Sequence, residues 1–454
     1  MAEELTWLPA WQIRDLVKKG DVSPVEVTDH FLGRIEELDG QLGTFAHIDA
    51  EGARSQATAA ERAVRQGDEL GSLHGIPVSV KEHIAVEGLP CYQIYPKAEG
   101  EPGGFGERPI ATRDSAAVER LRRAGAILIG TNVIGGDARN PWDPTRTPGF
   151  SSSGPAAASS ARLVPIAIGS DGGGSTRLPA AYCGVVGVHT TAGLVPELTH
   201  GRPRVPVITG STGPLCRDVV DAAVALQAMA GPDGRDYFCH LGEPDNYLAS
   251  IDSGVEGMRF AWTDDFGFAG AYAQDESPRV IATVRDAAAG LASVGAVVEP
   301  IDVVWEDFFS GFMASTYIFQ FGPMQRPQPT AEDWDESLEV RGRNWDRFMA
   351  VLDRHEVLLS PTSQIIAWTV EDFMGAWADG SRFHNGTFGP GTYTSHTHMF
   401  NWLGLPAFTV PCGFVDGMPV GLQLIGKPGG EASLFRVANA FQQAFPQAGH
   451  PTVS

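Results

Sequence analysis

Serine and glycine are concentrated in two clusters, at residues 148–154 and 169–177, and an alanine-rich run and a short apolar stretch lie between them. The second cluster, Gly-Ser-Asp-Gly-Gly-Gly-Ser-Thr-Arg, is followed by an apolar block at 178–188. A flexible linker would lack such a block, so we expect packed backbone here. A strand followed by three glycines and Ser175 can leave successive backbone N–H groups unpaired and directed at one anion.

Three kinds of site use such a turn. For two of them, this sequence lacks a residue that the motif requires. A dinucleotide fingerprint, G-x-G-x-x-G, would need glycine where Arg177 stands. A phosphate-binding P-loop would need lysine before Ser175, where the sequence has Gly174. The third is an oxyanion hole beside a nucleophilic serine. The G-x-S-x-G elbow of Ser-His-Asp hydrolases fits neither cluster, so an attacking serine needs a base other than histidine. The alternative is that these are ordinary turn residues.

The hydrophobic pattern around the clusters predicts an α/β fold. Ser23, Pro24 and Glu26 form the start signal of a helix, and residues 112–125 predict a helix that ends at Gly125. Strands are expected at 75–81, 126–129 and 163–168, and a strand, strand and helix at 406–444.

No repeat or linker divides the chain, so we expect one domain over residues 1–454. Residues 301–400 hold 17 of the 41 aromatic residues and predict a variable, substrate-facing region within it. Its aromatics are candidates for core or pocket wall: Trp305, Phe308, Phe309, Phe312, Tyr317 and Phe321.

Charge and cysteine content exclude several classes of protein. With 33 Lys and Arg against 55 Asp and Glu, the net charge of -22 repels phosphate backbones and anionic lipids, so neither nucleic acid nor a membrane is an expected partner. Five scattered cysteines without metal-ligand spacing predict buried thiols in a reducing compartment. His396 and His398 lack a third ligand nearby, and we expect no metal. The acidic first residues lack the pattern of a secretory leader, and a cytoplasmic location is expected.

Several long motifs, in order along most of the chain, resemble the amidase signature family. They are Gly-Ile-Pro-Val-Ser-Val-Lys at 75–81, Ala-Thr-Arg-Asp at 111–114, Arg-Asn-Pro-Trp-Asp-Pro at 139–144, both serine and glycine clusters, Gly-Pro-Leu-Cys-Arg-Asp at 213–218 and Pro-Val-Gly-Leu-Gln-Leu-Ile-Gly at 419–426. The resemblance implies an α/β/α fold with a large, twisted, mostly parallel mixed sheet covered by helices on both faces. It also implies a Ser, cis-Ser, Lys triad and no cofactor.

Carried over by motif, the resemblance assigns Ser175 as nucleophile, Lys81 as general base and Ser151 as the bridging serine with a cis peptide bond. A buried lysine can lose its proton near neutral pH and then accept one through Ser151. The backbone N–H groups of Gly172, Gly173 and Gly174 would form the oxyanion hole. Supporting roles fall to Ser152, Asp171 and Arg177, the last two as an ion pair that shapes the turn.

This chain departs from the family pattern next to the bridging serine. Phe150 and Ser153 replace glycines on either side of the serine pair, and Glu82 replaces the usual aspartate after Lys81. The spacing of 24 positions from Ser151 to Ser175 favours Ser151 over Ser152 as the bridge.

The leading hypothesis is an amidase that hydrolyses a small or medium carboxamide, aryl or alkyl, through an acyl-enzyme. A carbamate (urethane) or ester hydrolase would use the same chemistry. Two other hypotheses are the amidase subunit of a tRNA-dependent amidotransferase and a binding module without turnover. The expected partner is a small amide or carbamate substrate, with a homodimer as one candidate assembly.

Overall fold

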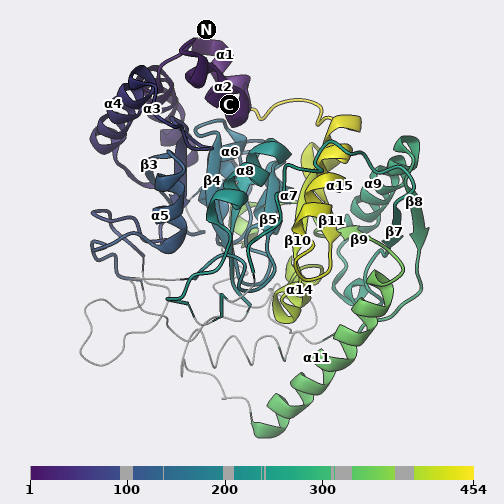
Figure 1. Ribbon diagram of the computed structural model, residues 1–454. Helices are drawn as coiled ribbons and strands as arrows, with labels where there is room; N and C mark the ends of the chain where they lie inside the picture. The colour runs from purple at the N-terminus through teal and green to yellow at the C-terminus, as the bar shows by residue number, and fades with distance from the viewer. Residues whose placement is uncertain are drawn as a thin grey trace.

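The computed structural model is shown in Figure 1. It describes residues 2–92, 106–135, 138–197, 209–236, 238–239, 242–307, 311, 330–373 and 393–454. Five of the aromatics named above, Phe308, Phe309, Phe312, Tyr317 and Phe321, lie outside the described residues. Trp305 is described: it is 1% exposed and stacks on Phe348 with ring centroids 4.5 Å apart, so it belongs to the core.

An 11-stranded sheet runs through the molecule in the order β1-β3-β2-β4-β6-β5-β10-β11-β9-β7-β8. In chain order the strands are β1 (Phe45–Ile48), β2 (Pro77–Lys81), β3 (Ile127–Asn132), β4 (Ile166–Asp171), β5 (Val186–His189), β6 (Ser211–Cys216), β7 (Arg259–Trp262), β8 (Val297–Pro300), β9 (Val357–Pro361), β10 (Ala407–Val415) and β11 (Met418–Ile425).

The described helices surround this sheet (Figure 1). The α-helices are α1 (Ala2–Trp7), α2 (Ala10–Lys19), α3 (Pro24–Leu42), α4 (Ala50–Gln66), α5 (Ala116–Arg123), α6 (Ser153–Ser160), α7 (Arg177–Cys183), α8 (Val219–Met229), α9 (Ser277–Gly290), α11 (Ala331–Leu352), α14 (His398–Leu403) and α15 (Glu431–Ala444). Two 3-10 helices, η1 (Ala269–Tyr272) and η2 (Leu291–Val294), flank α9.

The strand pairing confirms a mixed α/β sheet and corrects the expectation that it is mostly parallel. Strand β2 is parallel to β3 and β4, and β7 is parallel to β8 and β9. The other six pairs are antiparallel. One of these pairs, β10 with β11, is a hairpin closed by a short turn, and a hairpin must be antiparallel.

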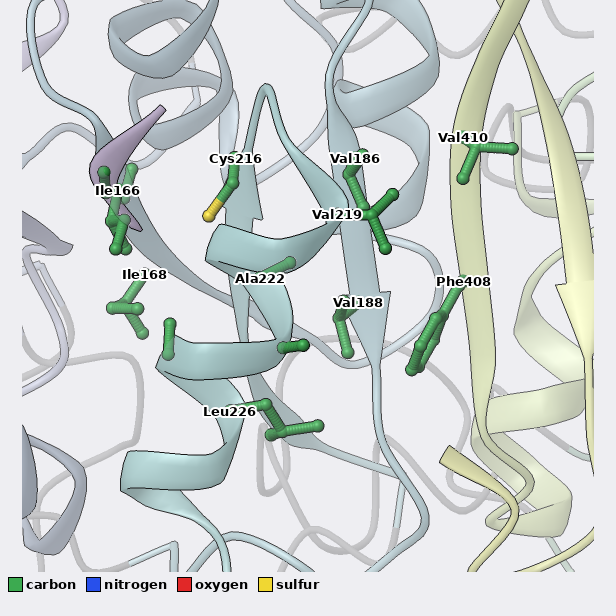
Figure 2. Close-up of a cluster of buried hydrophobic side chains, with 14 of the residues drawn as sticks. Ile166, Ile168, Val186, Val188, Cys216, Val219, Ala222, Leu226, Phe408 and Val410 are labelled. Carbon is green, nitrogen blue, oxygen red and sulfur yellow. The ribbon is translucent and has the colours of Figure 1, made fainter. Parts of the chain in front are cut away.

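Alternating side chains on the central strands bury both faces of the sheet. On one face, Cys216 of β6 packs with Ile166, Val186 and Phe408 against helix α8 (Figure 2). The next residue back, Leu215, points to the opposite face, where it clusters with alanines of α6 and α7. Helices therefore cover both faces, as expected.

Helix α3 begins where its sequence signal predicts, whereas the helix expected at 112–125 is shorter and spans Ala116–Arg123. Helix α3 has the complete capping box between Ser23 and Glu26, and α2 ends at Gly20 with φ 80°. Among the described residues, no helix is long and apolar enough to cross a membrane.

Strands β2 and β4 lie side by side and carry residues of the candidate site. They are parallel neighbours, with Val80 opposite Ile168, so their carboxyl ends reach the same edge of the sheet. Lys81 is the last residue of β2. Strand β4 runs to Asp171, further than the predicted end at Ile168, because Gly169, Ser170 and Asp171 continue to pair with β6.

Candidate active site

Lys81 lies among three serine hydroxyls. Its Nζ atom is 2.6 Å from Ser151 Oγ, 3.1 Å from Ser152 Oγ and 3.0 Å from Ser170 Oγ. The side chain is 2% exposed, and it has no ion pair among the described residues. A lysine amine here is held by neutral partners, which stabilise its charge less than a carboxylate would.

Burial lowers the pKa of Lys81 to about 7, although the negative charges of Asp171, Glu82 and Glu197 oppose this shift. Desolvation penalises the ammonium form, and the three hydroxyls do not replace the lost water fully. Near neutral pH a large fraction of the amine is therefore free of its extra proton. In that form it can accept a proton from a hydroxyl.

Ser152 ties the lysine to strand β4. Its Oγ donates to the Ser170 carbonyl at 3.0 Å and accepts from the Ser170 N–H at 3.2 Å. The same hydroxyl oxygen accepts the lysine contact, and helix α6 begins directly after it. Ser151 reaches Lys81 from an ordinary trans backbone: the described residues contain no cis peptide bond, so the cis geometry expected at this serine is not found.

The turn that carries Ser175 is organised by Asp171. Its carboxylate accepts hydrogen bonds from the backbone N–H groups of Gly174 at 2.6 Å, Thr176 at 3.1 Å and Arg177 at 3.3 Å. Ser175 itself is 7% exposed. Within the described residues, no hydrogen bond joins its hydroxyl to Ser151, so the structure brings Lys81 and Ser151 into direct contact but not Ser151 and Ser175.

The bond from Gly174 to Asp171 changes the expected oxyanion hole. Because this N–H is already donated to a carboxylate, Gly174 is not available as a donor to substrate. The N–H groups of Gly172, Gly173 and Ser175 have no acceptor within the described part of the chain. The free donors of the turn are therefore Gly172, Gly173 and Ser175.

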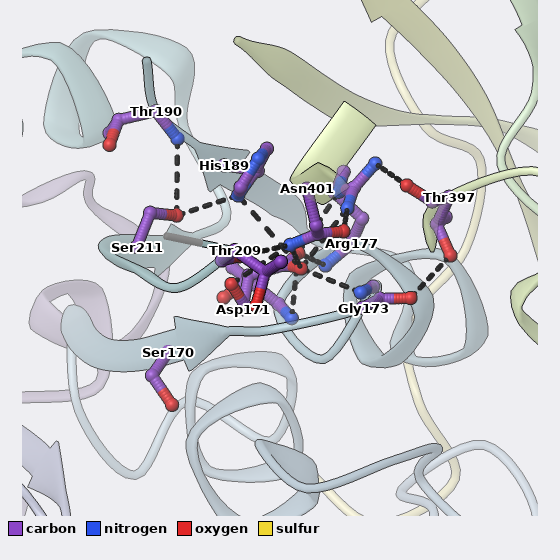
Figure 3. Close-up of polar contacts among 12 residues, drawn as sticks. Ser170, Asp171, Gly173, Arg177, His189, Thr190, Thr209, Ser211, Thr397 and Asn401 are labelled. Atoms are coloured by element: carbon purple, nitrogen blue, oxygen red, sulfur yellow. Dashed lines mark hydrogen bonds and ion pairs between the residues drawn. The ribbon is translucent and has the colours of Figure 1, made fainter. Parts of the chain in front are cut away.

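Asp171 and Arg177 form a fully buried ion pair (Figure 3). Arg177 Nε is 3.0 Å from Asp171 Oδ2, and Arg177 Nη2 is 3.1 Å from Oδ1. The remaining guanidinium N–H groups donate to Asn401 Oδ1, the Thr397 carbonyl and Gln423 Oε1. Burial alone would raise the pKa of Asp171, but the charge of Arg177 and the hydrogen bonds that Arg177 and Asn401 donate to this carboxylate hold it well below its usual range. The ion pair thus keeps Asp171 ionised, so that its carboxylate can accept the N–H groups of the turn.

Histidines near the site stay neutral. Burial and the charge of Arg177 lower the pKa of His189 to about 3, and its Nδ1 pairs with Ser211 Oγ at 2.7 Å. Burial, and next the charge of Lys81, lower the pKa of His83 well below its usual value. His396 and His398 are buried and bond to the carbonyls of Asp264 and Thr394.

The described part of the chain contains no set of side chains suited to bind a metal ion. No group of three or more His, Cys, Asp or Glu side chains there could hold an ion. None of the five cysteines, all of which are described, forms a disulfide, and four of them are buried. Burial raises the pKa of the Cys183 thiol, whose Sγ lies 3.4 Å from the Pro148 carbonyl oxygen.

Sequence reasoning missed Ser170, Thr397 and Asn401. Ser170 could have been found, because it lies at the carboxyl end of the strand that runs parallel to the one ending in Lys81. Thr397 and Asn401 come from the other end of the chain. No local pattern places them beside the Ser175 turn.

Comparison with known proteins agrees with this fold. A family model described as Amidase matches residues 26–324 and 323–435. The chain belongs to the amidase family, and is an enzyme that hydrolyses the carbon–nitrogen bond of an amide. It is 29% identical to an acylamidase of Rhodococcus erythropolis, covering 98% of this chain and 97% of the relative.

Two further relatives cover almost the whole chain. One is a subunit of the glutamyl-tRNA(Gln) amidotransferase of Moorella thermoacetica, 30% identical over 97% of both chains. The other is the peptide amidase of Stenotrophomonas maltophilia, whose structure superposes with a TM-score of 0.76 and 25% identity over 98% of both chains. The similarity therefore extends over the entire fold and includes enzymes with different substrates.

Proposed function

We propose that this amidase cleaves a small or medium carboxamide, aryl or alkyl, through an acyl-enzyme on Ser175. The observation that carries the proposal is the buried Lys81, with a pKa of about 7 and its Nζ 2.6 Å from Ser151 Oγ. An amine in this state is a suitable general base at neutral pH. The turn that presents Ser175 supplies three unpaired N–H groups beside it.

In the proposed first half-reaction, neutral Lys81 takes the proton of Ser151 while Ser151 takes the proton of Ser175. The oxygen of Ser175 then forms a bond to the carbonyl carbon of the amide. The carbonyl oxygen becomes an oxyanion, held by the N–H groups of Gly172, Gly173 and Ser175. When the C–N bond breaks, the relay returns the proton to the departing nitrogen, and an ester of Ser175 remains.

In the second half-reaction, water attacks the ester carbonyl, and the same relay accepts a proton from that water. The C–O bond to Ser175 then breaks, and the serine oxygen recovers a proton. The products are a carboxylic acid and the amine, and Lys81 ends neutral. Asp171 and Arg177 take no part in proton transfer, because their mutual ion pair fixes both charges.

Substrates other than carboxamides use the same steps. A carbamate or an ester offers a carbonyl with a leaving group, and either would acylate Ser175. The relative from Moorella thermoacetica favours a second candidate, the amidase subunit of a tRNA-dependent amidotransferase. Such a subunit would hydrolyse glutamine and form a stable complex with its partner proteins. The net charge of -22 gives no support for an RNA-handling assembly.

A substrate panel tests the proposal. Purified protein is assayed with anilides, aliphatic amides, carbamates, esters and glutamine, with Ser175→Ala as the matched variant. We expect release of amine from at least one amide, and its loss in Ser175→Ala with an unchanged melting temperature. Full activity in Ser175→Ala would refute the nucleophile. Hydrolysis of glutamine alone, together with a stable complex with partner proteins, would favour the amidotransferase instead.

The remaining expectations are part of this proposal. We propose that residues 1–454 act as one domain, with 301–400 contributing the variable wall of the substrate site, and that the chain can assemble as a homodimer. A binding module without turnover would show no product with any member of the panel. The cytoplasmic location stays a prediction.

A further inference from the structure

The peptide group between Gly173 and Gly174 is held at both ends by side chains. Its carbonyl oxygen accepts a hydrogen bond from Thr397 Oγ1 at 2.8 Å, and its N–H donates to Asp171 Oδ1 at 2.6 Å. In Figure 3, Thr397, the residue before α14, lies on the opposite side of Gly173 from Asp171. Because a peptide group is planar and its C=O and N–H point in opposite directions, these two bonds hold it from both sides and oppose its rotation.

This peptide is the centre of the turn that carries the proposed oxyanion donors. The unpaired N–H groups of Gly173 and Ser175 lie on the two sides of it, so their directions depend on how this one unit is rotated. Gly174 has φ +124°, and a Cβ atom there would lie 2.2 Å from Thr397 Oγ1. Thr397 therefore contacts the turn so closely that only glycine fits.

Thr397 is itself held in place by the buried ion pair. Its carbonyl accepts from Arg177 Nη1 at 3.1 Å. Four residues later, Asn401 Oδ1 accepts from Arg177 Nη2 at 2.5 Å, and Asn401 Nδ2 donates to Asp171 Oδ1 at 2.9 Å. Residues near the C-terminal end of the chain thus bind both the ion pair and the turn.

The hydroxyl of Thr397 has one proton and two nearby acceptors. The Thr394 carbonyl is 3.3 Å away, against 2.8 Å for the Gly173 carbonyl, so the shorter bond is to the turn. The Gly173 carbonyl has no other donor among the described residues. Loss of the hydroxyl would leave that carbonyl without its partner, and only the bond from Gly174 N–H to Asp171 would then hold the peptide.

We propose that Thr397 is a positioning residue of this amidase, whose hydroxyl orients the Gly173–Gly174 peptide so that the flanking N–H groups point at the substrate oxyanion. The inference rests on the proposed function, because it concerns the same site. Thr397 is distant in sequence from Ser175, and it would affect the transition state indirectly, by orienting the backbone of the turn. Its loss should weaken stabilisation of the oxyanion and leave substrate binding nearly unchanged.

The test compares two variants of Thr397 with a matched control. Thr397→Val keeps the shape and removes the hydroxyl, and Thr397→Ser keeps the hydroxyl. The control is Thr409→Val: Thr409 is also fully buried, and its hydroxyl pairs with Thr362 Oγ1 at 2.9 Å, away from the turn. We measure kcat, KM, the pH profile of kcat/KM and the melting temperature, using an amide that the wild-type protein cleaves.

We expect Thr397→Val to lower kcat about 100-fold, in the range seen when an oxyanion donor is lost, with KM within about twofold. Thr397→Ser should recover most of that loss. The midpoint of the pH profile should stay near 7, since Lys81 is untouched. Thr409→Val should lower the melting temperature about as much as Thr397→Val does, and it should keep the wild-type kcat.

Three results would overturn the inference. They are a kcat of Thr397→Val equal to that of Thr409→Val, a loss that appears only in KM, and a failure of Thr397→Ser to recover activity although it folds. Failure of the proposed function looks different. In that case the wild-type protein itself releases no amine, or Ser175→Ala remains active.

Discussion

Burial of Lys81 should make the stability of the fold depend on pH. The pKa of this lysine is about 7 in the folded protein, against an ordinary value of 10.5 when exposed. Between these two values the unfolded chain binds more protons than the folded one. The free energy of unfolding therefore rises with pH across this window, and the contribution is smallest at neutral or lower pH, where the unfolded lysine is fully charged.

The size of the effect follows from the two pKa values. From pH 7 to pH 10 a single group with this shift adds about 3 to 4 kcal/mol to the free energy of unfolding. Other groups titrate in the same range, so the measurement compares wild type with Lys81→Met. The variant keeps an unbranched, buried side chain but has no amine to titrate.

Urea unfolding at pH 7, 8, 9 and 10 gives the free energy for both proteins. The difference between wild type and Lys81→Met should change by about 3 to 4 kcal/mol over this range, in favour of wild type at high pH. Parallel curves for the two proteins would show that Lys81 has an ordinary pKa. The argument for a neutral lysine base would then be refuted.

Two further substitutions test the geometry of the Ser175 turn and the effect of a neighbouring charge on the pKa of Lys81. Gly174→Ala places a Cβ 2.2 Å from Thr397 Oγ1 at φ +124°, and we expect kcat to fall by about 100-fold or more, measured by amine release; wild-type kcat would contradict the geometry. Glu82 is buried, pairs with Arg108, and its charge raises the pKa of Lys81. Glu82→Gln should therefore move the acidic limb of the kcat/KM profile to lower pH, and a shift to higher pH would contradict this assignment.

Local signals were sufficient to predict the strand that ends at Lys81 and the start of helix α3. The capping box at Ser23 sets a helix start that the structure reproduces, because this signal acts within one turn of helix. The contact between Lys81 and Ser151 followed from motifs that lie 70 positions apart in sequence. Motif resemblance supplied this pair, and hydrophobic periodicity alone could not.

Features that depend on non-local pairing were the ones predicted wrongly or missed. The balance of parallel and antiparallel strands depends on which strands become neighbours, and six of the ten pairs proved antiparallel. Whether the Gly174 N–H can bind substrate depends on the position of the Asp171 carboxylate, which accepts its hydrogen bond. Thr397 and Asn401 reach the turn only because α14 packs beside it. Such contacts have no signature in the residues next to them.

Mass spectrometry of the protein after reaction with a fluorophosphonate tests the central claim most directly. Wild type should carry one adduct, on the peptide that contains Ser175, and it should form faster as the pH rises through about 7 because neutral Lys81 removes the serine proton. Lys81→Met should react slower by several orders of magnitude. An adduct on another residue, or equal labelling of wild type and Lys81→Met, would contradict the account.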